Sequence, residues 1–331
     1  MVHPRAGSQG PAGGPGFCPH PRGIFPQTAK EAVRIRMGQA LSSFFLETLL
    51  TTLPQNATIF LKQKPTDTKT EGGDSSFMQE AFEYLEAGQG PTITLLHGLF
   101  GGPSNWAEVI PSLARDFHVL APKFPLDGSI PITSLQPLTD FVKRFLDFKE
   151  VQQTALCGNS LGGQVALDFC LKYPDRVTKL ILAGSAGLYE RHLADGSLPR
   201  PDKEFVREQA QKIFYDKHYI SEDLIEQISQ QLQDRHYVRF LIRVAKVTRD
   251  YRMDDELAKV KVPTLLVWGA QDEVTPPSVA YQFHEHLPNA QLVFFDRCGH
   301  APPIEHPEKF SETVREFLAK PSLPAPSLPL A

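Results

Sequence analysis

The stretch Ala155-Leu156-Cys157-Gly158-Asn159-Ser160-Leu161-Gly162-Gly163 decides how this chain is interpreted. An apolar run, 154–157, leads into the pattern Gly-x-Ser-x-Gly, and apolar side chains then recur at helical spacing over 164–171. The pattern therefore predicts a strand, a tight turn and a helix. The glycines leave room for a strained turn. The hydroxyl of Ser160 is expected to stand clear of the sheet, beside the amide of Leu161.

Composition narrows the class of protein. The 331 residues suffice for one large domain or two small ones, and 41% hydrophobic residues can form a sizeable core. A formal net charge of -4 gives no electrostatic reason to propose nucleic acid as a partner. The four cysteines are far apart and form no C-x-x-C pair, which argues against a disulfide framework. No run approaches the roughly 20 apolar residues of a membrane span, and the first residues lack the apolar segment of a signal peptide. We therefore expect a soluble, cytoplasmic protein.

Short apolar runs alternate with helical patterns over residues 77–187 and 260–320, as in a mostly parallel sheet flanked by helices. The expected strands are 82–85, 92–96, 117–121, 154–157, 179–183, 264–268 and 291–295. The expected helices are 104–113, 135–148, 164–171, 277–286 and 307–318. Residues 188–259 break the alternation with three helical segments, 204–215, 222–232 and 237–247. This insertion predicts a helical cap over one edge of the sheet.

Residues 1–76 precede this pattern and differ from it. The start is rich in Gly and Pro, residues 28–53 have amphipathic helical spacing, and a polar, linker-like segment follows. Three interpretations stay open for 28–53: a helix that docks elsewhere, a weak targeting segment, or translated sequence upstream of a true start at Met78. Most of the extension and the Pro-rich tail, 321–331, are expected to be disordered.

Polar residues collect where the predicted strands end, which is where ligands bind in open α/β sheets. They are His97, Ser160, Asp272 and His300. A serine hydroxyl is a weak nucleophile until a base takes its proton, and the base needs a third group to fix its tautomer. The chain order serine, aspartate, histidine is one in which such triads occur after a Gly-x-Ser-x-Gly turn. We expect His97 to brace its loop, and Glu273 to point away from the site.

From about residue 78 to 320 the chain resembles the α/β-hydrolase superfamily, in particular its esterase-like and carbon–carbon hydrolase branches with a helical cap. The matching segments are "LLHGLFGGPSNW", the nucleophile elbow "GNSLGG", "WGAQDEVTPP" and "CGHAPPIEHPEKF". The resemblance implies an α/β-hydrolase fold with Ser160 as nucleophile, His300 as general base and Asp272 as orienting acid. Some members place the acid after the preceding strand, but this chain has Gly184-Ser185 there.

The same resemblance places the oxyanion hole at the backbone N–H groups of Leu99 and Leu161. Phe100 and Asn159, which adjoin these positions and the serine, are expected to contact the substrate. Neither a metal-ligand spacing nor a phosphate-binding loop occurs in the sequence, so neither a metal nor another cofactor is expected.

The predicted activity is hydrolysis of a carboxylic ester, or a related acyl bond, of a small molecule through an acyl-enzyme. Serine at 160 argues against the epoxide hydrolase and haloalkane dehalogenase branches, which use aspartate. A carbon–carbon hydrolase of dienoic ring-cleavage products is the alternative. Such enzymes share the Asn before the serine, but tryptophan typically follows their base, where this chain has Ala301. A cofactor-free peroxidase and a catalytically silent binding module also stay open, although silent members usually lack a triad residue.

Overall fold

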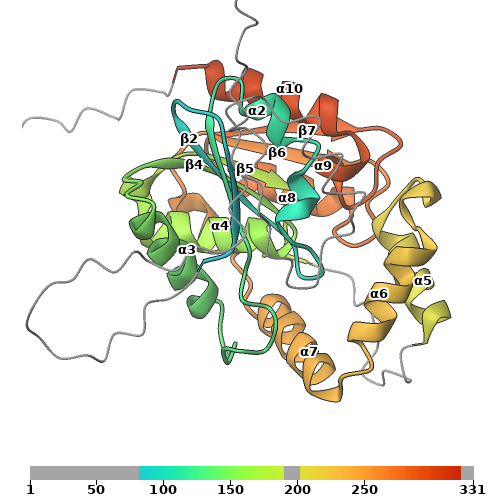
Figure 1. Cartoon of the computed structure of the whole chain (residues 1–331). Helices are drawn as coiled ribbons and strands as arrows, with labels where there is room; N and C mark the ends of the chain where they lie inside the picture. The colour runs from blue at the N-terminus through green and yellow to red at the C-terminus, as the bar shows by residue number, and fades with distance from the viewer. Residues whose placement is uncertain (1–81, 190–201, 322–331) are drawn as a thin grey trace, which may run out of the picture. The chain divides into compact units, whose positions relative to one another are not determined.

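The computed structural model describes residues 82–189 and 202–321. The extension 1–76 with its expected helix 28–53, and the tail beyond 321, lie outside the described residues. Within these ranges the strands form one mostly parallel sheet of seven, in the order β1-β3-β2-β4-β5-β6-β7 (Figure 1). The sheet confirms the expected α/β architecture.

The strand positions follow the apolar runs of the sequence. The strands are β1 (Tyr84–Ala87), β2 (Thr92–Leu96), β3 (His118–Pro122), β4 (Thr154–Asn159), β5 (Val177–Ala183), β6 (Thr264–Gly269) and β7 (Ala290–Phe295). Only β1 runs antiparallel, against β3, and the other pairs are parallel. Every residue of β4 and β6 is buried, as expected for strands covered on both faces.

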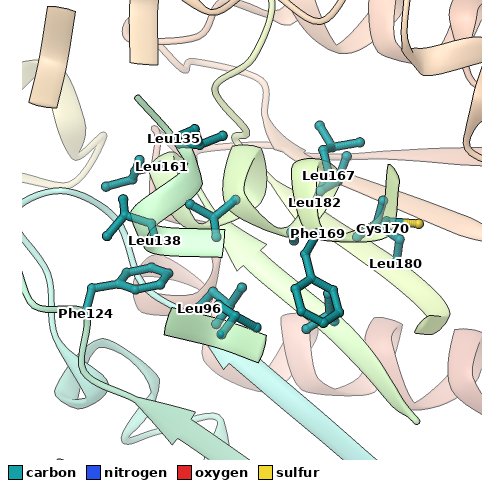
Figure 2. Close-up of a cluster of buried hydrophobic side chains, with 14 of the residues drawn as sticks. Leu96, Phe124, Leu135, Leu138, Leu161, Leu167, Phe169, Cys170, Leu180 and Leu182 are labelled. Atoms are coloured by element: carbon teal, nitrogen blue, oxygen red, sulfur yellow. The ribbon is translucent and has the colours of Figure 1, made fainter. Parts of the chain in front are cut away.

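Helices cover both faces of the sheet (Figure 1). They include α2 (Ile110–Leu113), α3 (Gln136–Phe148), α4 (Leu161–Lys172), α8 (Pro277–His286) and α10 (Pro307–Ala319). Side chains alternate along each strand, so Leu156 and Leu180 join a buried cluster with α3, α4 and α8. Figure 2 shows part of this cluster, including Leu180 of β5 and Phe169 of α4. Cys157 and Ile181 point to the opposite face, where α2 and α10 pack. The strand ends are therefore held between two apolar layers.

Among the described residues between β5 and β6, three α-helices occur where the cap is expected. They are α5 (Lys203–Ile213), α6 (Glu222–Gln231) and α7 (Arg235–Asp250). Asp202, Ser221 and Asp234 cap their N-termini with side-chain hydrogen bonds. Val206 and Ala210 of α5 pack on Ile225 of α6, whereas Phe240, Leu241 and Val244 of α7 join the core cluster beside α3 and α4. Helix α7 thus ties this segment to the core.

The single helix expected over 104–113 is wrong. The structure has a 3₁₀ helix, η2 (Pro103–Trp106), and then the short α2. Pro111 explains the break, because a proline inside a continuous helix lacks the N–H for its i−4 bond and its ring clashes with that carbonyl. In the structure Pro111 instead lies in the first turn of α2, where no such bond is needed.

The remaining short elements are η3 (Pro174–Arg176), η4 (Lys217–Tyr219), η5 (Leu257–Lys259) and α9 (Pro302–Glu305). Of these, α9 follows His300 directly and was not expected from the sequence. None of the described helices is both long and apolar enough to cross a bilayer.

Candidate active site

Ser160 lies in the turn between β4 and α4 with φ 54° and ψ -120°. A positive φ is strained for a residue with a Cβ, and such strain concentrates at functional sites. The turn depends on close backbone approach, since a Cβ at Gly158 would overlap the carbonyl oxygen of Gly162, and one at Gly162 would overlap that of Leu96. The expected strand, tight turn and helix are therefore present, with the serine at the N-terminus of α4.

Asp272 and His300 follow β6 and β7, and the structure brings their side chains into contact. His300 Nδ1 lies 2.9 Å from Asp272 Oδ2. A carboxylate oxygen only accepts, so Nδ1 carries the hydrogen of this bond and Nε2 is the basic nitrogen of the ring. Both residues are buried, with exposed fractions of 3% and 6%. The carboxylate thus selects one imidazole tautomer.

The carboxylate of Asp272 is itself held by four donors. Its Oδ1 accepts the backbone N–H groups of Val274 (2.8 Å) and Thr275 (2.9 Å). Its Oδ2 accepts the Thr275 hydroxyl at 2.9 Å as well as His300. A Cβ at Gly184, the position after β5, would lie 3.2 Å from Oδ2 and 3.1 Å from His300 Nδ1. The carboxylate therefore has one fixed orientation toward the imidazole.

The loop after β2 is fixed by His97. Its Nδ1 donates to the carbonyl of Gly98 at 2.8 Å, and its Nε2 accepts the N–H of Phe124 at 2.9 Å. Burial lowers the pKa of His97 to about 4, so the ring is neutral near pH 7. Because both ring nitrogens are engaged, His97 braces this loop.

Gly98 brings that loop against the serine, since a Cβ on Gly98 would lie 3.3 Å from Ser160 Cβ. Leu99 follows and packs against the core, and the ring of Phe100 is 47% exposed. Leu161 opens α4, and the first N–H groups of a helix have no carbonyl partner within it. The two amides expected to form an oxyanion hole therefore belong to segments that meet at Ser160.

Asn159, expected at the substrate, makes protein contacts in this structure. Its side-chain nitrogen donates to the carbonyls of Ala183 (2.8 Å) and His300 (3.1 Å). The backbone N–H of Ser160 donates to the same carbonyl of Ala183 at 3.1 Å. The side-chain amide of Asn159 thus joins the turn at Ser160 to the end of β5 and to the histidine loop.

Two residues at this site escaped the sequence analysis. Thr275 supports Asp272, and its hydroxyl three residues after the aspartate in "DEVT" is a signal for a local side-chain turn. Glu305 lies five residues after His300, is buried, and accepts the N–H of Gly299 at 2.7 Å. A charged residue within the apolar segment "APPIEHP" was the available signal for Glu305.

The thiols of Cys157 and Cys298 are poor candidates for a nucleophile. Cys157 and Cys298 flank the site in sequence, and burial raises the pKa of both thiols, so each packs as an apolar side chain. Among the residues that the structure describes, His, Cys, Asp and Glu form no group that could hold a metal ion.

Known proteins are similar to this chain in sequence and in fold. The sequence model of the alpha/beta hydrolase family matches residues 95–313. The chain is 28% identical over 256 residues to the 2-hydroxy-6-oxo-6-phenylhexa-2,4-dienoate hydrolase of Burkholderia cepacia, covering 71% of this chain and 90% of that protein. The residues that the family model matches include the elbow, the acid loop and the histidine loop. The chain therefore belongs to the alpha/beta hydrolase family.

Two solved structures extend the comparison. MGS-MChE2, an alpha/beta hydrolase enzyme from the metagenome of sediments from the lagoon of Mar Chica, Morocco, is 34% identical with a TM-score of 0.59, covering 72% of this chain and 94% of that one. A membrane phospholipase A, described as a novel bacterial virulence factor, is 25% identical with a TM-score of 0.64, covering 72% of this chain and 82% of that one. The relatives thus include a protein named as a dienoate hydrolase and one named as a phospholipase A.

Proposed function

We propose that this hydrolase cleaves a carboxylic ester, or a related acyl bond, through an acyl-enzyme on Ser160. The supporting observations are the buried contact between Asp272 and His300, 2.9 Å long, and the strained turn at Ser160, whose preceding residue Asn159 binds the backbone carbonyl of His300. Together they match the three parts that serine hydrolysis needs: a nucleophile, a base and a group that orients the base.

In the proposed reaction, Ser160 Oγ attacks the carbonyl carbon and His300 Nε2 takes the hydroxyl proton. Asp272 stabilises the imidazolium that forms. The tetrahedral intermediate collapses, the carbon–oxygen bond to the alcohol breaks, and the alcohol leaves with the proton from His300. Water then attacks the acyl-enzyme while His300 takes its proton. The bond between the acyl carbon and Ser160 Oγ breaks, Ser160 regains the proton from His300, and the acid is released.

The backbone N–H groups of Leu99 and Leu161 are the proposed oxyanion hole. The N-terminus of α4 adds to this role, because its dipole and unpaired N–H groups favour negative charge. We propose that Phe100 and Asn159 adjoin the substrate, with Asn159 acting through the bonds it makes to the histidine loop.

A carbon–carbon hydrolase of dienoates is the second candidate, and the similarity to the dienoate hydrolase of Burkholderia cepacia favours it. Two observations favour the ester. Ala301 follows the base, where tryptophan is typical of the carbon–carbon enzymes, and it is buried. The side chains beside the proposed oxyanion hole, Leu99, Phe100 and Leu161, are apolar and offer no cation for a dienoate carboxylate. We further propose a small-molecule substrate and a cytoplasmic location, both on the composition of the chain.

The test is a comparison of substrates on the purified chain. We expect hydrolysis of p-nitrophenyl esters, with kcat/KM depending on acyl chain length, and slower turnover of 2-hydroxy-6-oxo-6-phenylhexa-2,4-dienoate. If the dienoate reacts faster than every ester, the carbon–carbon assignment replaces the ester assignment. If neither class reacts, the proposed function is wrong.

A further inference from the structure

Glu305 connects the histidine loop to the cap segment through a single carboxylate. One oxygen, Oε1, accepts the backbone N–H of Gly299, the residue before His300, at 2.7 Å. The other, Oε2, accepts the backbone N–H groups of Tyr215 at 2.7 Å and Asp216 at 3.3 Å. Tyr215 and Asp216 follow the end of α5, and Glu305 ends α9 (Figure 1). Oε1 therefore binds the histidine loop, and Oε2 binds the residues that follow α5.

The histidine loop also touches α5 through its own backbone. The N–H of His300 donates to the carbonyl of Ile213 at 2.7 Å. Ile213 is the last residue of α5, where helical carbonyls have no partner within the helix. A Cβ on Gly299 would overlap this same carbonyl. The histidine backbone is thus bound directly to the end of a cap helix.

We propose that Glu305 is a positioning residue: it fixes the end of α5 against the histidine loop and so sets the direction in which His300 faces Ser160. The proposal rests on the proposed function, in which His300 is the base. Asp272 fixes the rotation of the imidazole ring, whereas Glu305 fixes the backbone from which the ring projects.

The geometry requires a carboxylate at this position. Both oxygens accept, and together they bind three N–H donors. A glutamine has only one carbonyl oxygen. Its NH₂ group would therefore face either the N–H of Gly299 or the N–H groups of Tyr215 and Asp216, and two donors cannot bond to each other. Glu305→Gln therefore keeps the shape and breaks the connection on one side. Burial raises the pKa of Glu305, and the backbone N–H bonds oppose this shift by favouring the ionised form.

The test compares Glu305→Gln with Glu312→Gln, which removes the same charge from an exposed position on α10. We expect kcat on a p-nitrophenyl ester to fall by about 10- to 100-fold in Glu305→Gln, because small misplacements of a base are costly. The KM for the ester should change little. The folded fraction, which circular dichroism measures, should also change little. The rate at which a fluorophosphonate labels Ser160 should fall in parallel. Glu312→Gln should match the wild-type chain.

Hydrogen exchange supplies a readout that needs no activity. Peptides covering 296–301 and 212–217 should both exchange faster in Glu305→Gln and stay unchanged in Glu312→Gln. The proposal is overturned if folded Glu305→Gln keeps both the kcat and the exchange rates of the wild-type chain. It is also overturned if kcat falls only in proportion to the loss of folded protein. Should the glutamine variant not fold, Glu305→Asp keeps the charge but shortens the reach, and the same two readouts apply. A wild-type chain that neither hydrolyses esters nor takes the label contradicts the proposed function instead, and exchange still reports whether Glu305 joins the two segments.

Discussion

The side-chain amide of Asn159 donates to the backbone carbonyl of His300 at 3.1 Å, across 141 residues of sequence. Its nitrogen also donates to Ala183 at the end of β5, at 2.8 Å. The residue before Ser160 therefore holds the backbone of His300. The relative position of Ser160 and His300 therefore depends on this bond as well as on the sheet.

Ser160→Ala should abolish covalent labelling by a fluorophosphonate probe and lower kcat by about 10⁴-fold or more, because the nucleophile is removed and only binding and the oxyanion hole remain. Labelling is read by mass spectrometry and kcat from ester hydrolysis. Ser112→Ala, on α2, is the matched control and should keep both. An alanine variant at 160 that retains the wild-type rate means that another group is the nucleophile.

Asp272→Asn should lower kcat by about 10³- to 10⁴-fold while the fold persists. Oδ1 of Asp272 accepts two backbone N–H groups, so the oxygen of the new amide takes that place and its nitrogen faces His300. Nδ1 must then accept, and the hydrogen moves to Nε2, which can no longer take the serine proton. Glu273→Gln changes the neighbouring carboxylate and should lower kcat only slightly. The reverse order of effects would place the acid at Glu273.

Gly162→Ala should destabilise the protein by about 3 kcal/mol or prevent folding, since the added methyl group meets backbone that cannot move freely. A Cβ there would overlap the carbonyl of Leu96 and lie 2.8 Å from that of His97. Gly102→Ala is the control, because a Cβ at Gly102 would meet nothing closer than 3.7 Å and its φ of -159° suits any residue. Urea denaturation gives the two free energies of unfolding. Equal values would mean that the elbow relaxes around the methyl group.

His97 should make stability depend on pH. Burial lowers its pKa from 6.5 to about 4, so the unfolded chain binds the extra proton first as the pH falls. The contribution is present above pH 6.5 and is lost between pH 6.5 and pH 4, amounting to about 2–3 kcal/mol between pH 7 and pH 4.5. His97→Asn should be less stable at pH 7 and lose less on acidification. Parallel stability curves for the two proteins would show that His97 does not titrate as proposed.

The boundary near residue 77 stays a prediction, because residues 1–76 lie outside the described part of the chain. The family match begins at residue 95, and the first described strand at Tyr84. A chain that starts at Met78 should therefore fold and keep its esterase rate. Melting temperature and kcat/KM measure this, with the full chain as control. A large fall in melting temperature would assign residues of 1–77 to the core.

Local pattern predicted the strands well. All seven expected strands occur, with ends displaced by at most two residues. Short β-branched and apolar runs in an α/β chain strongly favour buried strands. The single helix over 104–113 was wrong, because Pro111 cannot lie in the interior of a continuous helix. The triad was predicted from residue type, chain order and position at strand ends, and none of these needs a distance.

The sequence by itself determined the sheet, the elbow turn around Ser160 and the pairing of Asp272 with His300, because each follows from local chemistry or from parallel strands ending at one edge. Only the tertiary structure decided what Asn159 and Glu305 contact. Their partners are backbone groups far along the chain, and every residue type except proline offers the same N–H and C=O. A pattern of side chains cannot identify such partners, so the bonds that hold the histidine loop to β5 and to α5 appear only once the chain is folded.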